Sequence, residues 1–189
     1  MKKALVVALA VALVFGISVS AQAKKMFVMN FDKGGMPNDS SNCEFSLSEE
    51  KAPKGQIYLK VTATEAGKPI MFGEYAPKKA NWDGYDVVRF DYFNEGKNPQ
   101  ALIFTIKPKG ATYPTRMDAS FIARPGKGSV EIEIAGACGN GGTPIDWKTP
   151  LYQWYVNGPL SSAIHFGNIT LETLEDDKPA KKEEKKKAE

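Results

Sequence analysis

The chain has 189 residues, of which 42% are hydrophobic, and a formal net charge of +3 at pH 7. This length and composition predict one folded domain of ordinary size. Acidic and basic residues nearly balance, so no nucleic-acid partner is expected from charge.

The first 23 residues have the pattern of a secretory signal peptide. Lys2 and Lys3 precede an apolar run over residues 4–19, and Ala21-Gln22-Ala23 fits a small-residue cleavage site. The apolar run is too short, and too closely followed by polar chain, for a membrane span. We therefore expect cleavage after Ala23 and a secreted or periplasmic protein with no membrane span left. An uncleaved N-terminal anchor is the alternative.

Residues 175–189, EDDKPAKKEEKKKAE, predict a disordered charged tail. They contain no large apolar side chain whose burial would offset the entropy cost of ordering. A short charged helix is the alternative, although such a helix is marginal in water. The folded domain is therefore expected over residues 24–174.

Short apolar strands separated by turn residues fill this domain, and no long stretch has the 3.6-residue period of an amphipathic helix. In chain order the expected strands are residues 26–31, 43–47, 56–64, 69–75, 85–93, 101–107, 116–123, 129–134 and 163–171. The pattern predicts an all-β fold, a single antiparallel β-sandwich.

Residues 82–107 predict a β-hairpin at the centre of this fold. A strand from Tyr85 to Phe93 is joined by the connection NEGKNPQ to a strand from Ala101 to Lys107. Side chains alternate along a strand, so two faces are expected in the first strand. The core face holds Val88, Phe90 and Tyr92, and the mixed face holds Val87, Arg89, Asp91 and Phe93.

Residues 135–162 are rich in Gly and Pro and predict the longest irregular region of the chain. The region carries four large aromatic residues, Trp147, Tyr152, Trp154 and Tyr155. Aromatic rings on rigid loops suit ligand stacking. The alternative is that some of them cover the open end of the sandwich. In the strand that follows, Gly167-Asn168 interrupts the alternation and predicts a bulge.

Cys43 and Cys138 are the only cysteines. An even count in an exported chain predicts one disulfide. Closing a loop of about 95 residues would stabilise the fold by up to ~4 to 5 kcal/mol. Two buried free thiols are the alternative. Two cysteines and one histidine are too few for a structural zinc site.

No recognisable catalytic constellation is present, so a non-enzymatic protein is expected. The single histidine, His165, lies between Ile164 and Phe166 in an expected strand, where a structural residue on the outer face is the favoured interpretation. GNGG at 139–142 lacks the helix of a phosphate-binding loop. Glu131 and Glu133 have the spacing of any exposed strand. A small hydrolase with acids from distant positions is the remaining alternative.

No cofactor is expected. Asn30, Asp32 and Asp39 lie in a turn-rich segment and offer oxygen ligands that suit calcium. Their spacing does not match an EF-hand loop, and solvated turn residues are the favoured interpretation. A structural calcium ion is kept as the alternative.

Several segments together resemble the galactose-binding-like, jelly-roll β-sandwich of non-catalytic carbohydrate-binding modules. They are MNFD from Met29, LKVTAT from Leu59, NWDGYDVVRFDYFN from Asn81, ALIFTIK from Ala101, FIARPGKGSVEIEI from Phe121 and IHFGNITLE from Ile164. The resemblance covers nearly all of residues 26–172. Modules of this kind often carry an acidic residue in the last strand where Gly167-Asn168 stands here, which weakens the inference of the calcium ion that many of them hold.

The resemblance implies sugar binding on a sheet face or on the loops at one end, with aromatic rings stacked on the sugar and polar groups fixing its hydroxyls. The sheet-face candidates are Arg89, Asp91 and Phe93. The loop candidates are Tyr113, Arg116, Trp147, Tyr152 and Trp154. For Arg89 and Asp91 the alternative is a surface pair without a ligand.

We therefore expect an exported, non-enzymatic sandwich that binds carbohydrate or another cell-envelope polymer. The alternative is a protein-interaction or structural module, in which the aromatic loop docks a partner protein and the charged tail is a spacer.

Overall fold

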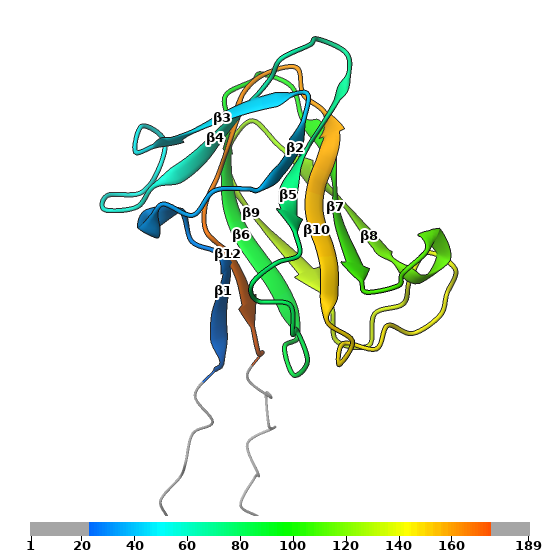
Figure 1. The fold of residues 1–189 in the computed structure, drawn as a ribbon. Coiled ribbons are helices and arrows are strands. Elements are labelled where there is room, and N and C mark those ends of the chain that lie inside the picture. The colour runs from blue at the N-terminus through cyan, green and yellow to red at the C-terminus, as the bar shows by residue number, and fades with distance from the viewer. Residues whose placement is uncertain (1–22, 175–189) are drawn as a thin grey trace, which may run out of the picture.

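Two antiparallel β-sheets packed face to face make up residues 23–174, the part of the chain that this computed structural model describes (Figure 1). Almost all of the predicted signal peptide, and all of the predicted charged tail, lie outside these residues. Within residues 23–174 no helix has the length and apolar character needed to cross a membrane.

Sheet A has seven strands and sheet B has five. Sheet A contains β1 (Lys25–Met29), β3 (Cys43–Ser48), β4 (Tyr58–Ala63), β6 (Val87–Asn94), β9 (Gly126–Glu133), β11 (Ile164–Phe166) and β12 (Ile169–Glu172). Sheet B contains, in spatial order, β2 (Asp39–Ser41), β5 (Pro69–Tyr75), β10 (Leu151–Pro159), β7 (Gln100–Pro108) and β8 (Met117–Ala123). Two short 3-10 helices, η1 (Phe31–Lys33) and η2 (Tyr113–Thr115), lie in the connections.

Sheet A divides at Gly167-Asn168. Strand β6 has β9 on one side and, on the other, β11 followed by β12. Strand β4 continues the sheet from β11, and β1 continues it from β12. At the division the Gly167 amide donates to the Asp91 carbonyl oxygen at 2.8 Å. The predicted interruption of the last strand is therefore confirmed, as a complete break between two strands.

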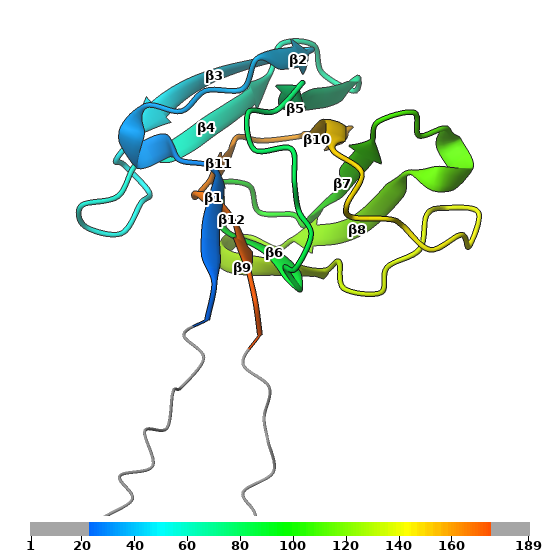
Figure 2. The same cartoon turned by 60° about the horizontal axis from the view of Figure 1, so that its bottom comes forward.

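The hairpin predicted for residues 82–107 is wrong. Strands β6 and β7 cover nearly the predicted residues, but β6 lies in sheet A and β7 in sheet B, so the connection between them crosses the sandwich (Figure 2). Each strand has one apolar face, and the two faces meet across the core, where the Phe90 and Phe104 ring centroids are 5.8 Å apart. Alternation predicted which face is buried, but not which strand lies beside which.

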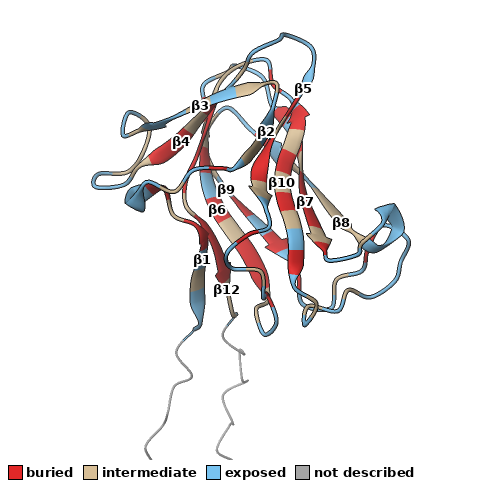
Figure 3. Cartoon of the chain, viewed as in Figure 1, coloured by how far each residue is buried: buried red, intermediate tan, exposed pale blue. Residues whose placement is uncertain are grey.

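The strand β10 was missed, because its residues fell in the predicted irregular region. It is the central strand of sheet B, and buried and exposed residues alternate along it (Figure 3). The Trp154 ring lies inside the sandwich, parallel to Phe104 with 5.6 Å between the ring centroids. Trp154 is wholly buried, so its predicted place in an exposed loop is wrong. The Gly and Pro residues on both sides of β10 made its alternation of inward and outward side chains hard to recognise in the sequence.

The predicted disulfide is also wrong, because both cysteines are free thiols. The half-buried Cys43 begins β3, and its Sγ donates to the Met71 carbonyl oxygen at 3.2 Å. Burial raises the pKa of this thiol. Cys138 is exposed in the connection over residues 134–150, yellow in Figures 1 and 2, which lies at the far side of the domain from β3.

The side chain of His165 lies on the outer face of sheet A, as predicted, but it is wholly buried there. Its Nε2 lies 2.7 Å from Glu95 Oε1, and the Phe93 ring packs edge-on against it. Lys60 also pairs with Glu95, at 3.2 Å. These contacts are consistent with a structural role for His165.

Replacing Trp154 by alanine should remove a wholly buried ring from the core of the sandwich. We expect Trp154→Ala to lower the free energy of unfolding by roughly 3 to 5 kcal/mol, measured by urea denaturation. The matched control is Tyr152→Ala on the same strand, whose exposed side chain should contribute about 1 kcal/mol or less. Equal effects of the two substitutions would contradict the buried position of Trp154.

Free thiols predict that reducing agents leave stability unchanged. The thermal midpoint of the purified domain should be the same with and without dithiothreitol, and thiol titration in denaturant should find two reactive groups per chain. In the folded protein the exposed Cys138 should react faster than Cys43. A lower thermal midpoint in the presence of dithiothreitol would contradict the free thiols and would support the predicted disulfide.

Candidate functional site

Four tyrosines gather on or beside the outer face of sheet B, and we call this surface the tyrosine face. Tyr75 lies in β5, Tyr152 and Tyr155 lie in β10, and Tyr113 lies in η2. Because side chains alternate along β10, the burial of Trp154 directs Tyr155 outward. Tyr113, Tyr75 and Tyr152 are 65%, 47% and 40% exposed, so their rings are open to solvent.

The strand register places one residue from each of the five strands of sheet B in a row that includes Tyr155. Tyr155 pairs with Gly73 of β5 and Thr105 of β7. The row continues to Asp118 of β8 and to Asp39 of β2. A Cβ atom at Gly73 would collide with the Trp154 carbonyl oxygen and with Tyr155, so only glycine allows β5 and β10 to approach this closely. The close approach fixes the position of Tyr155 in the row.

Asp118 organises a network of hydrogen bonds on this face. Its Oδ2 accepts from Arg116 Nε and Nη2, at 3.1 and 2.9 Å, and from Asn140 Nδ2 at 2.8 Å. Its Oδ1 accepts from Thr105 Oγ1 at 2.7 Å. Burial alone would raise the pKa of Asp118, but these bonds and the Arg116 charge lower it. Asp118 is thus held as a carboxylate.

Arg116 is held in place by the same network. Burial opposes its charge, but the hydrogen bond to Asp118 and the charges of Asp118 and the nearby tyrosines together raise the pKa of Arg116. Its guanidinium also lies over the Tyr113 ring, 4.8 Å from the ring centroid. A donor fixed in this way loses little conformational freedom when a ligand binds.

Other polar atoms on the tyrosine face have no hydrogen-bond partner within residues 23–174. They are Arg116 Nη1, Tyr155 Oη, Asn157 Oδ1 and Gln153 Oε1. Asn157 and Gln153 are oriented by their amide nitrogens, which donate to Thr105 Oγ1 and Asp39 Oδ2. The face therefore offers donors and acceptors in fixed positions beside aromatic rings, an arrangement that suits a polyhydroxylated ligand.

At one end of the face two tyrosines and a lysine form a small aromatic cluster. The Tyr75 and Tyr152 rings meet edge to face, with centroids 4.8 Å apart. Lys107 Nζ lies 5.4 Å from the centroid of the Tyr152 ring. A hydrogen bond with Tyr75 and burial raise the pKa of Tyr152. These rings extend the aromatic surface beyond Tyr155.

Three of the predicted loop residues, Tyr113, Arg116 and Tyr152, come together on the tyrosine face. Trp147 does not, because its half-buried ring stacks on Trp82 and its Nε1 donates to the Ile134 carbonyl oxygen at 2.7 Å. Trp154 is in the core and has no surface for a ligand.

The site residues that the sequence prediction left out are Tyr75, Thr105, Asp118, Gln153 and Asn157. Tyr155 was noted among the aromatic residues of region 135–162 but was not one of the final candidates. Two signals could have found some of them. Arg116 and Asp118 are two residues apart in an expected strand, so their side chains share a face. Gln153, Tyr155 and Asn157 follow the same spacing, but only once β10 is recognised as a strand.

The predicted sheet-face residues lie on the opposite side of the molecule, on sheet A. Arg89 is engaged with Glu131 and, at 2.9 Å, with Glu172, rather than with Asp91. The hydrogen bond to Glu131 raises the pKa of Arg89. Arg89 and Asp91 line a cavity of about 260 Å³.

The third sheet-face candidate, Phe93, is covered on this surface. It packs on His165, and Lys51 Nζ lies 5.5 Å from its ring centroid. Sheet A therefore presents ion pairs where sheet B presents open tyrosine rings.

The three residues considered for calcium do not come together in the structure. Both carboxylate oxygens of Asp32 already accept hydrogen bonds at 2.6 Å, from the Ile57 amide and from Asn168 Nδ2. Asn30 caps η1, and Asp39 lies in the other sheet, bonded to Gln153. In residues 23–174 no cluster of three His, Cys, Asp or Glu side chains could hold a metal ion.

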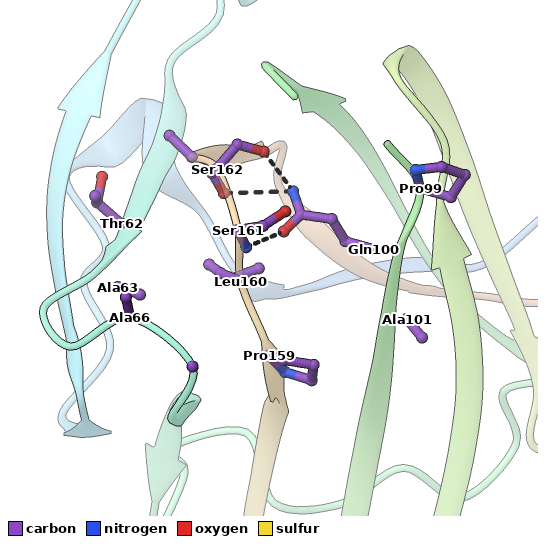
Figure 4. A pocket seen from close by; sticks show the side chains of 12 residues that line it. Thr62, Ala63, Ala66, Pro99, Gln100, Ala101, Pro159, Leu160, Ser161 and Ser162 are labelled. Carbon is purple, nitrogen blue, oxygen red and sulfur yellow. Dashed lines mark hydrogen bonds between the residues drawn. The ribbon is translucent and has the colours of Figure 1, made fainter. Parts of the chain in front are cut away.

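A separate hollow, which we call the end pocket, lies at one end of the sandwich (Figure 4). It has a volume of about 530 Å³ and lies between the β4–β5 turn, the link from β10 to β11 and the start of β7. Its lining residues are Thr62, Ala63, Ala66, Gly67, Pro99, Gln100, Ala101, Pro159, Leu160, Ser161, Ser162 and Ala163.

No protein-family model matches the sequence, and no curated protein matches it at a significant level. Among solved structures, an exo-β-agarase matches with a TM-score of 0.63 and 10% identity, over 78% of this chain and 25% of the agarase chain. The family 11 carbohydrate-binding module of the cellulosomal cellulase Lic26A-Cel5E of Clostridium thermocellum matches with a TM-score of 0.54 and 14% identity, over 78% of this chain and 94% of the module.

The solution structure of CtCBM11 also matches, with a TM-score of 0.54 and 13% identity, over 84% of this chain and 92% of that one. This chain thus spans about a quarter of the agarase and nearly the whole of the isolated modules. The predicted architecture is confirmed: the fold of this chain is the jelly-roll β-sandwich seen in carbohydrate-binding modules.

Proposed function

We propose that this protein is an exported, non-catalytic module that binds a neutral polysaccharide on its tyrosine face. The observation that carries the proposal is the position of Tyr155 in one row with the Arg116–Asp118 network on the outer face of sheet B. An aromatic ring stacks on the C–H face of a sugar, and fixed polar groups beside it bond the hydroxyls.

The balance of charge on the face supports a neutral ligand. Arg116 is paired with Asp118, and the Asp39 carboxylate accepts from the Gln153 amide. Lys107 is directed over the Tyr152 ring. The charge of Arg116 is thus already compensated by Asp118, and the network already satisfies the Asp118 carboxylate.

The structural neighbours supply the first polymers to test. One is an agarase, and another is a module of a cellulase. Their names support agarose and cellulose as initial candidates, and a polyuronate is a suitable charged control. The proposal of export rests on the signal-peptide pattern of residues 1–23.

Removing the central ring should abolish most of the binding without unfolding the domain. We expect Tyr155→Ala to weaken polysaccharide binding by about tenfold or more, as expected for a loss of about 1.4 kcal/mol. The measurement is a pull-down on insoluble agarose and cellulose with quantified free protein, and circular dichroism checks the fold.

The control for this experiment is Asp91→Asn on sheet A, which should bind as the wild type does. Binding lost in Asp91→Asn and kept in Tyr155→Ala would move the site to sheet A. Failure of the wild type to bind any neutral polysaccharide would refute the proposal and would favour a protein partner.

The lowered pKa of Asp118 predicts how binding depends on pH. A carboxyl group whose pKa is lowered in the folded state stabilises the fold at pH values above its ordinary pKa of 3.8. This stabilisation is lost as the pH falls through the lowered pKa. Binding of the wild type should therefore be constant from pH 7 to about pH 4 and fall only below that range.

The matching variant is Asp118→Asn, which removes the charge that holds Arg116. It should bind weakly at every pH, so the fall at acid pH should be reduced. Isothermal titration across the pH range, with fold checked at each point, is the measurement. A wild-type loss of binding centred near pH 6 would contradict this role of Asp118.

A further inference from the structure

The end pocket opens at one end of the tyrosine face. Pro159 and Ala101 line the pocket, are exposed, and belong to the strands β10 and β7 that form the centre of sheet B. Pro159 pairs with Pro69 and lies four residues beyond Tyr155, so both point to the outer face. At about 3.3 Å per residue the distance along the strand is about 13 Å.

The surface between Tyr155 and the pocket continues the same kind of chemistry. Asn157 pairs with Ile103 of β7 and Met71 of β5, and all three are half-buried on the outer face. The Asn157 Oδ1 has no partner among the residues described, while Met71 and Ile103 offer apolar surface. A ligand lying along β10 therefore meets aromatic, amide and apolar groups without interruption.

The lining of the end pocket contains no charged side chain. Small residues such as Ala63, Ala66 and Gly67 leave the space open on one side, and Pro99 and Pro159 form rigid walls (Figure 4). A charged group entering this hollow would lose hydration and find no counter-ion. A volume of about 530 Å³ is within the range for small-ligand sites.

The polar groups of the pocket divide into a fixed set and an unused set. Gln100 Nε2 donates to Ser162 Oγ at 2.8 Å, and Gln100 Oε1 accepts from the Ser161 amide at 2.8 Å. The buried Asn94 also accepts from Gln100 Nε2, at 2.9 Å. In residues 23–174 the hydroxyls of Thr62 and Ser161 have no hydrogen-bond partner. The pocket thus combines a rigid polar wall at Gln100 with the Thr62 and Ser161 hydroxyls, which remain available to a ligand.

We propose that the end pocket binds the uncharged terminal sugar of a glycan whose preceding sugars lie on the tyrosine face. This inference rests on the proposed function. The apolar walls receive the C–H surface of the sugar, and the Thr62 and Ser161 hydroxyls bond its oxygens. The protein then recognises a chain end, and does not bind at every position along a polymer.

A charge placed in the pocket tests this inference. Ala101→Glu should weaken binding of neutral agaro- and cello-oligosaccharides by about tenfold, measured by isothermal titration. The matched control is Ser46→Glu, an exposed position on β3 of sheet A, which adds the same charge and should leave affinity unchanged. Ser161→Ala, which leaves the pocket volume nearly intact, should weaken binding several-fold.

Chain length gives a second and independent measurement. Partial hydrolysis of the polysaccharide raises the number of chain ends per gram, so the bound protein per gram should rise in proportion. A capacity that is independent of chain length would overturn the inference. So would an Ala101→Glu variant that binds as tightly as the wild type.

The outcomes separate this inference from the proposed function. Loss of binding in Tyr155→Ala together with unchanged binding in Ala101→Glu refutes the end pocket and keeps the tyrosine face. Failure of the wild type to bind both oligosaccharides and polymers refutes both. Loss in both variants, with the Ser46→Glu control unaffected, supports both.

Discussion

The parallel contact between Trp154 and Phe104 is the constraint on which the rest of the domain depends. It places β10 and β7 side by side with their apolar residues inward. The indole Nε1 donates to Glu74 Oε2 at 3.0 Å, so the one polar atom of the ring is satisfied. Burial raises the pKa of Glu74, although this hydrogen bond opposes the rise. Because a strand has a period of two, an inward Trp154 requires an outward Tyr155.

The two sheets of the sandwich differ in what they present to solvent. On sheet A the outward side chain of Arg89 is paired with Glu131 and Glu172, and His165 is buried. On sheet B the charges hold one another in place while tyrosine rings stay open. A surface whose polar groups are already oriented, and whose rings are exposed, loses less entropy on binding than a flexible one. This contrast is the reason why the proposed binding site is placed on sheet B.

Most of the fold could be predicted from the sequence, because period-two alternation reports burial directly. The inward positions of Val88, Phe90 and Tyr92 were correct, and so was the interruption at Gly167-Asn168. Strand neighbours were not predictable in the same way. An apolar face indicates that the opposite sheet covers a strand, but it does not indicate which strands pair with it in its own sheet.

The candidate site was only partly predictable for a related reason. Tyr113, Arg116 and Tyr152 were identified by residue type, and the structure brings them together. Asp118 and Tyr155 depend on the register between β10, β7 and β8, which joins residues distant in sequence. Trp147 and Trp154 were misplaced because a large ring in a Gly- and Pro-rich segment suits a core equally well.

The pairing of β1 with β12 has a consequence for how this domain connects to anything else. Lys25 lies opposite Glu172, so the two ends of the described residues lie on neighbouring strands, at the bottom of Figure 1. The segments that form the end pocket lie at the top of the same view. A host protein could therefore receive the whole sandwich at a single surface loop, since the entry and exit points are only about 5 Å apart. A domain inserted in this way would be held at the end that carries β1 and β12. The opposite end, with the end pocket, would remain accessible.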